Sequence, residues 1–108
     1  MASDIPEGLA IDTVWAVEAS YAPDAAERRV PVRAEHLRHM AALRHAGTIL
    51  EVGGYLDMSG SLALIRAADE AAAVAVLQDD VYFRSGVWTG FRVRKLGRVV
   101  RTEELSAR

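Results

Sequence analysis

Residues 11–21 read IDTVWAVEASY, and this stretch decides the fold class. Its β-branched and aromatic residues predict a strand, which residues 21–24 (YAPD) bring to an end. Side chains alternate between the two faces of a strand. Apolar side chains fall on both faces here, with Trp15, Val17 and Ala19 on one side and Val14 and Ala16 on the other. We therefore expect this strand to lie in the middle of a sheet.

The segments that follow change their periodicity several times. Residues 31–46 predict a helix that begins at Pro31 and ends before Gly47. Residues 48–53 and 61–66 predict strands joined by a hairpin loop over residues 53–60 (GGYLDMSG). A second, alanine-rich helix is capped by Asp69 and runs to about Gln78, and a last strand covers residues 87–96. The order is β-α-β-β-α-β.

This order is typical of the ferredoxin-like α+β plait, in which two helices cover one face of a four-stranded antiparallel sheet. Right-handed crossovers bring the end of the first strand, the start of the first helix, the hairpin loop and the end of the second helix to one rim. The other face of the sheet has no helix, so we expect a homodimer packed face to face through it. The alternative is a monomer whose tails shield that face.

The composition is that of one globular domain of 108 residues, with 51% hydrophobic and 26% charged residues and a net charge of −2. We expect the domain over residues 11–100, a loose leader over residues 1–10 and a frayed tail over residues 101–108. The chain has no cysteine, which excludes disulfides, thiolate metal sites and a cysteine nucleophile. It has no apolar run near the ~18 residues of a membrane span, and residues 1–10 carry acids rather than a signal segment. We expect a cytoplasmic protein with no membrane partner.

Basic residues concentrate late in the chain, with six between Arg84 and Arg101 and no acid among them. This stretch is interpreted as a solvated strand face, with a patch that binds phosphate or carboxylate as the alternative. A dedicated nucleic-acid binder usually has a net basic surface, so the negative net charge argues against a nucleic-acid partner.

All three histidines lie in the first predicted helix. At about 100° per residue, Arg33 and His36 fall on the inward face, His39 on its border and His45 on the solvent side. The three point in different directions, so no metal site is expected. Arg33 and His36 are candidates for a site at the helix start. In the alternative interpretation, His36 is a core histidine bonded to a carbonyl oxygen and Arg33 reaches solvent from the helix end.

Asp79 and Asp80 are predicted at the C-terminal end of the second helix, where the helix dipole disfavours negative charge. An acid there needs a cation or a hydrogen-bond donor, and the topology places the start of the first helix beside it. His36 with one aspartate is a general acid/base arrangement, because the carboxylate fixes the imidazole tautomer. An ordinary ion pair between helices is equally compatible with the sequence.

Two glycines and two tyrosines are weaker candidates for ligand binding. Gly53 and Gly54 predict a tight hairpin turn, and their backbone N–H groups are candidate ligand contacts. Tyr55 and Tyr82 are candidate pocket residues, with simple packing as the alternative. The sequence has no GxSxG, Walker or GxGxxG motif in the right setting.

Several of these segments together resemble the YciI-like (YCII-related) family over about residues 13–100. The matching segments are Arg28–Arg29, Val32–Leu37, Gly47, Val52–Gly54 and Asp80–Val87. The resemblance implies a ferredoxin-like fold, dimers of the α+β barrel type and an active site built on a His and an Asp, which match His36 and Asp80. The sequence departs from the family pattern at Gly54, Val81 and Lys95, where the family often has proline.

We therefore expect a small enzyme of lyase or isomerase type that acts on a small anionic organic molecule without a metal or organic cofactor. His36 would move a proton, Asp80 would orient His36, and Arg33 would hold a carboxylate or enolate oxygen. Gly53, Gly54 and Tyr82 complete the expected binding site. The main alternative is a non-catalytic ligand-binding or accessory module with the same cleft. A monooxygenase of the dimeric α+β barrel group is a weaker one.

Overall fold

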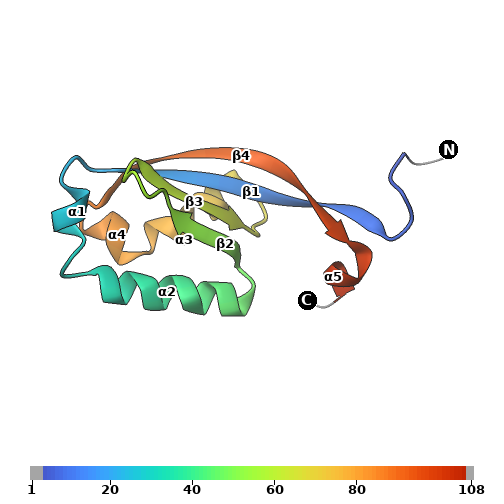
Figure 1. Ribbon diagram of the computed structural model, residues 1–108, viewed down its shortest axis with the longest axis horizontal. Coiled ribbons are helices and arrows are strands. Elements are labelled where there is room, and N and C mark those ends of the chain that lie inside the picture. The colour runs from blue at the N-terminus through green and yellow to red at the C-terminus, as the bar shows by residue number, and fades with distance from the viewer. Residues whose placement is uncertain (1–3, 107–108) are drawn as a thin grey trace.

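The sheet of the computed structural model, which describes residues 4–106, has four antiparallel strands in the order β2-β3-β1-β4 (Figure 1). The helices lie against one face of it. This is the ferredoxin-like α+β fold, and β1 is central as its two apolar faces predict. The strands are β1 (Leu9–Tyr21), β2 (Ile49–Gly54), β3 (Gly60–Ile65) and β4 (Trp88–Arg101).

The two predicted helices are α2 (Arg33–Ala46) and α3 (Glu70–Gln78). The first begins at Arg33 rather than at Pro31, and it ends as predicted at Gly47, whose φ of 83° suits glycine. The second is capped by Asp69, whose carboxylate accepts a hydrogen bond from the Ala72 N–H at 2.8 Å. Three short helices were not predicted, because each spans too few residues to show a period: α1 (Ala25–Arg28), α4 (Val81–Arg84) and α5 (Thr102–Ser106).

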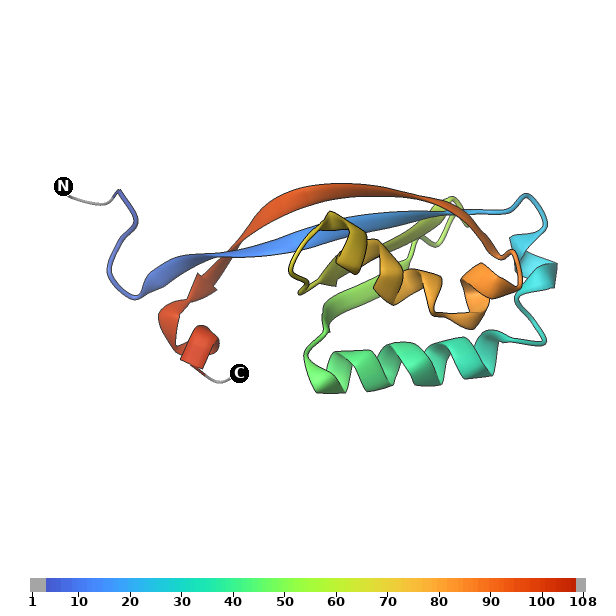
Figure 2. The ribbon, with the colours of Figure 1, turned by 180° about the vertical axis from the view of Figure 1, so that it is seen from behind.

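Strands β1 and β4 are longer than predicted and extend beyond the sheet as a two-stranded ribbon (Figures 1 and 2). Residues 9–14 of β1 pair only with residues 96–101 of β4, since β3 pairs with β1 from Trp15 onward. The described part of the expected leader therefore includes the start of β1, and the described part of the expected tail includes α5. Residues 1–3 and 107–108 of these segments lie outside the described residues, and the division into leader, domain and tail stays a prediction.

The hairpin between β2 and β3 turns later than expected. Gly53 and Gly54 belong to β2 and not to the turn, and the residue with positive φ is Met58, at 64°. The Asp57 carboxylate accepts a hydrogen bond from the Ser59 N–H at 2.9 Å, which closes the turn locally. Glycine at position 54 leaves room for the Tyr21 side chain, because a Cβ there would lie 2.8 Å from the Tyr21 hydroxyl oxygen.

The hydrophobic core lies between the sheet and the helices. Its largest fully buried side chains include Trp88 and Tyr82, which contact each other edge to face with ring centroids 5.5 Å apart. None of the helices within residues 4–106 has the length and apolar character that crossing a membrane requires.

The sheet face opposite the helices is less apolar than expected. Val14 is fully buried, while the rest of the face carries both charged and apolar side chains. A hollow there is lined by Ala16, Glu18, Leu62, Leu64, Arg92, Arg94 and Leu96. The basic residues of β4 therefore have different surroundings, since Arg98 lies beyond this hollow and pairs with Asp12 at 3.0 Å.

Gly60 provides a test of the sheet register. It pairs with Ser20 on one side, and a Cβ on it would lie 2.5 Å from the Ala19 carbonyl oxygen. We expect Gly60→Ala to lower the free energy of unfolding by about 2 kcal/mol, because the backbone of β1 or β3 must shift to make room for the new methyl group. Gly90 pairs with Ser20 from the other side and has nothing within 4 Å, so Gly90→Ala is the matched control. Equal stability of the two variants in urea unfolding would contradict this register.

Candidate active site

His36 is held in the first part of α2 by aromatic packing. The ring lies flat on Tyr82, with centroids 3.5 Å apart and planes at 6°, and its edge meets Trp88 at 5.3 Å. Its side chain is only 9% exposed. The inward position predicted from the helical period is therefore confirmed, and the ring has one defined orientation.

Asp80 lies at the junction of α3 and α4 and is fully buried. It is the N-cap of α4, and its Oδ2 accepts a hydrogen bond from the Tyr82 N–H at 2.9 Å. The expectation that Asp80 sits at the unfavourable end of a helix is thus wrong. The unpredicted α4 begins directly after it, so Asp80 occupies a position that favours a carboxylate. Asp79 is the residue that ends α3, and it is exposed.

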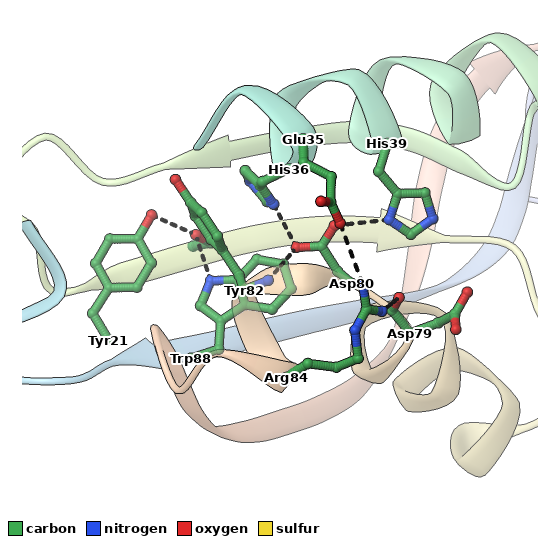
Figure 3. A network of polar contacts seen from close by, with 10 residues as sticks. Tyr21, Glu35, His36, His39, Asp79, Asp80, Tyr82, Arg84 and Trp88 are labelled. Atoms are coloured by element: carbon green, nitrogen blue, oxygen red, sulfur yellow. Dashed lines mark hydrogen bonds and ion pairs between the residues drawn. The ribbon is translucent and has the colours of Figure 1, made fainter. Parts of the chain in front are cut away.

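The Asp80 carboxylate joins two histidines of α2 (Figure 3). His36 Nδ1 lies 2.6 Å from Asp80 Oδ2, and His39 Nδ1 lies 2.7 Å from Asp80 Oδ1. The predicted contact of His36 with one of the two aspartates is present, and the partner is Asp80. His39 was predicted only at the border of the inward face, and its bond to Asp80 was missed. The signal was its i, i+3 spacing from His36, which places both rings on neighbouring positions of one helix face.

Asp80 is ionised at neutral pH. Burial raises the pKa of its carboxyl, but hydrogen bonds from His36, His39 and the Tyr82 N–H lower it by more, so the pKa lies below its usual value. An ionised carboxylate only accepts hydrogen bonds, so both imidazoles donate through Nδ1–H. The Nε2 of His36 has no protein partner within residues 4–106.

His36 faces a cavity of about 210 Å³ between the start of α2, the end of β2 and the hairpin turn. Along one wall, Trp88 Nε1–H donates to Ser61 Oγ at 3.3 Å, and Ser61 Oγ donates to the Tyr21 hydroxyl at 2.9 Å. Absence of a side chain at Gly54 leaves room for that hydroxyl. The residues that line the cavity are Tyr21, Arg29, Arg33, His36, Leu37, Met40, Val52, Gly53, Gly54, Tyr55, Leu56, Met58, Ser61 and Tyr82.

All of the residues predicted for ligand binding line this cavity, namely Arg33, Gly53, Gly54 and Tyr82. The predicted burial of Arg33 is wrong, because Arg33 is the first residue of α2 and is exposed at the cavity rim. Arg29 joins it there and was not predicted, since it lies outside the expected helix. Neither arginine forms an ion pair with a carboxylate among the residues that the structure describes.

Tyr82 adds a neutral hydroxyl to the cavity. Burial and the neighbouring Tyr21 raise the pKa of this hydroxyl, and Arg29 and Arg33 oppose the rise without cancelling it. It therefore stays protonated at neutral pH and is available as a hydrogen-bond donor. The cavity thus combines a base, two cations and phenolic hydroxyls, which suits an anionic ligand.

The side chains near Asp80 do not form a metal site. No group of three or more His, Asp or Glu side chains within residues 4–106 is arranged to hold a metal ion. His36 and His39 each direct Nδ1 to one oxygen of the Asp80 carboxylate.

A sequence model of the YCII-related domain matches residues 13–96, which is most of the chain. The chain belongs to the YCII-related domain family. The family suggested by the helix start and the segment after Asp80 is therefore confirmed. A search of curated proteins finds no match for this YCII-related protein.

A solved structure of a different protein has the same fold. It is 5-chloro-2-hydroxyhydroquinone dehydrochlorinase from Burkholderia phenoliruptrix AC1100, in complex with 2,5-dihydroxybenzoquinone. The TM-score is 0.64 at 19% sequence identity, and the similarity covers 75% of the YCII-related protein and 90% of the dehydrochlorinase. At this identity the comparison establishes the fold alone.

Asp80→Asn tests how strongly the buried carboxylate holds the site together. We expect a loss of about 3 kcal/mol in the free energy of unfolding, because the amide donates where two imidazoles and a backbone N–H also donate. The neighbouring Asp79→Asn is the control, since Asp79 is exposed and should change stability by less than about 0.5 kcal/mol. Similar losses in both variants, measured by chemical unfolding at pH 7, would contradict the role given to Asp80.

The same carboxylate should make stability depend on acid pH. The pKa of Asp80 is lower in the folded state than in the unfolded chain, where it is about 3.9. The ionised carboxylate therefore contributes fully to the free energy of unfolding above about pH 3.9, and this contribution is lost as the pH falls through the folded pKa. The stability difference between wild type and Asp80→Asn should therefore shrink below about pH 4. Thermal unfolding from pH 7 to pH 2 measures this, and a difference that stays constant would argue against an ionised Asp80.

Proposed function

We propose that this YCII-related protein is a small cytoplasmic enzyme of lyase or isomerase type that moves a proton on a small, anionic, single-ring organic molecule. One observation carries the proposal: the 2.6 Å contact of His36 Nδ1 with the fully buried Asp80 carboxylate, beside an open cavity. A histidine fixed in this way presents Nε2 as a base.

His36 acts as the general base and then as the general acid. The ionised Asp80 accepts Nδ1–H, which fixes the tautomer and leaves a lone pair on Nε2. Nε2 takes a proton from a substrate O–H or C–H bond, and the electron pair of that bond stays on the substrate. The resulting imidazolium is stabilised by Asp80, which remains ionised throughout.

The substrate anion formed in this step needs positive charge nearby. Arg29 and Arg33 stand at the cavity rim without carboxylate partners among the described residues, and Tyr82 offers a hydroxyl donor. In a lyase reaction the electron pair forms a new double bond, and the leaving group departs with its own pair. In an isomerase reaction the imidazolium returns the proton to another atom of the substrate. Neither route requires a metal or an organic cofactor.

The cavity size limits the substrate to about one ring. A cavity of about 210 Å³ compares with roughly 150 Å³ for a cavity that holds benzene. The ligand of the dehydrochlorinase structure, 2,5-dihydroxybenzoquinone, belongs to this size class and has acidic hydroxyl groups. Loss of hydrogen chloride, which a dehydrochlorinase catalyses, is a lyase reaction that begins or ends with proton removal. We therefore propose hydroxylated rings of this kind as the substrate class.

The test combines binding and turnover. We expect 2,5-dihydroxybenzoquinone to bind the wild type and to move the NMR signals of His36, because its anionic oxygens would meet Arg33 and Nε2. Chloride release from 5-chloro-2-hydroxyhydroquinone should fall about 10³-fold in His36→Gln, the usual contribution of a general base. His45→Gln is the control, because His45 is exposed on the far side of α2.

The outcomes separate the proposed enzyme from its alternative. Binding at His36 without chloride release by the wild type would favour the non-catalytic ligand-binding module. A folded His36→Gln protein with undiminished turnover would remove His36 from the mechanism, and absence of binding would reject the substrate class.

We also propose that the protein is a homodimer formed through the sheet face that has no helices. This proposal is supported by the partly buried Leu62 and Leu64 on that face, and by Glu18 beside Arg92 and Arg94. Both charge signs occur on the face, so a two-fold partner could pair acid with base across it.

Leu64→Glu should convert the dimer to a monomer, because it places a charge on the apolar part of the proposed interface. Light scattering coupled to gel filtration measures the mass. Val30→Glu is the control, since Val30 is 71% exposed between α1 and α2 and away from the open face. A wild-type protein that is monomeric at micromolar concentration would contradict the proposal.

A further inference from the structure

His39 contacts the Asp80 carboxylate from the side opposite to the cavity. Asp80 Oδ2 bonds to His36, which lines the cavity, whereas Asp80 Oδ1 bonds to His39, which lines a shallow hollow on the outer surface. The two openings share no residue. One buried carboxylate therefore serves two imidazoles in different surroundings (Figure 3).

The two imidazoles differ in their exposure to solvent. The His39 side chain is 29% exposed, while the His36 side chain is 9% exposed and stacked on Tyr82. Burial disfavours the charged form of an imidazole, and His36 is the more buried of the two rings. Solvent also reaches His39 directly from the outer hollow.

Neighbouring charges act in the same direction. Around His39, the charged groups are Glu35 and Arg38 of α2, Asp79 at the end of α3 and Arg84 of α4, and their formal charges cancel. Within this set Arg84 pairs with Glu35 at 3.3 Å and also donates to the Asp79 carbonyl oxygen. Around His36, the cavity adds the two cations Arg29 and Arg33 and the neutral hydroxyls of Tyr21 and Tyr82. A positive charge on the His36 ring would therefore share its cavity with two arginines, whereas the charged groups around His39 sum to zero.

We propose that His39 is a positioning residue that takes the first proton of the His36–Asp80–His39 group and so keeps the His36 imidazole neutral as a base. With His39 protonated, the charge of Asp80 is already balanced, and protonation of His36 would place two imidazolium ions on one carboxylate. This inference rests on the proposed function of His36 as the general base. It assigns to His39 the control of the pH range in which that base is available.

The direct test is an NMR titration of the histidine rings in the wild-type protein and in His39→Gln. In the wild type, His39 should gain its proton at higher pH than His36, because the two sites titrate as a coupled group. In His39→Gln, which keeps a neutral donor, the protonation midpoint of His36 should move upward by about one unit, since Asp80 is left unbalanced. His45→Gln should leave this midpoint unchanged.

A charge-retaining variant separates the effect of charge from that of packing. His39→Lys keeps a positive group beside Asp80, so the His36 midpoint should stay at or below the wild-type value. If turnover is found, the acid limb of its pH profile should move upward in His39→Gln and should be restored in His39→Lys.

Three results would overturn the inference. These are an unchanged or lowered His36 midpoint in folded His39→Gln, an equal shift in His39→Lys, or protonation of His36 before His39 in the wild type. The last result needs no variant, so it applies even if substitution at His39 prevents folding. The titration does not depend on turnover, and a failure of the proposed enzyme activity would therefore be distinguishable from a failure of this inference.

Discussion

The buried carboxylate of Asp80 is the constraint on which the rest of the site depends. A charge removed from water must be balanced by donors, and here the donors come from the two helices that flank the cavity. His36 and His39 approach from α2, and the Tyr82 N–H approaches from α4. The two imidazole bonds join α2 to the junction of α3 and α4, and the Tyr82 N–H bond caps α4 at the same carboxylate, so the bonds that organise the site also link these helices.

The departures from the family pattern leave this constraint intact. Val81 stands where proline is common, and it is the first residue of α4, the position at which a backbone N–H has no partner within a helix. The valine N–H therefore needs no partner within the helix, and the bond from the Tyr82 N–H to Asp80 is unaffected. Gly54 opens space for the Tyr21 hydroxyl, which makes one cavity wall polar. Lys95 lies on β4 over the Trp15 ring at 5.5 Å and takes no part in the cavity.

Much of the fold and part of the site could be predicted from the sequence. Element order determines the sheet topology, and the helical period together with that topology brings His36 next to Asp80. Features that depend on single residues at element ends escaped prediction. Arg33 lies at the cavity rim because α2 begins at Arg33 and not at Pro31. Asp80 is a cap because α4 begins directly after it, and a helix of four residues shows no period in the sequence. The i, i+3 spacing places His39 near His36, but it does not show that both rings reach the two oxygens of the same carboxylate.

The tautomer of His36 in the wild-type protein is the measurement that tests the account most directly. Long-range proton–nitrogen correlation spectra at neutral pH distinguish a ring protonated at Nδ1 from one protonated at Nε2. If the ionised Asp80 organises the site, His36 carries its hydrogen on Nδ1 and leaves Nε2 bare toward the cavity. A His36 ring protonated at Nε2 and bare at Nδ1 would contradict the account, since it would offer no hydrogen to the carboxylate and no base to a substrate.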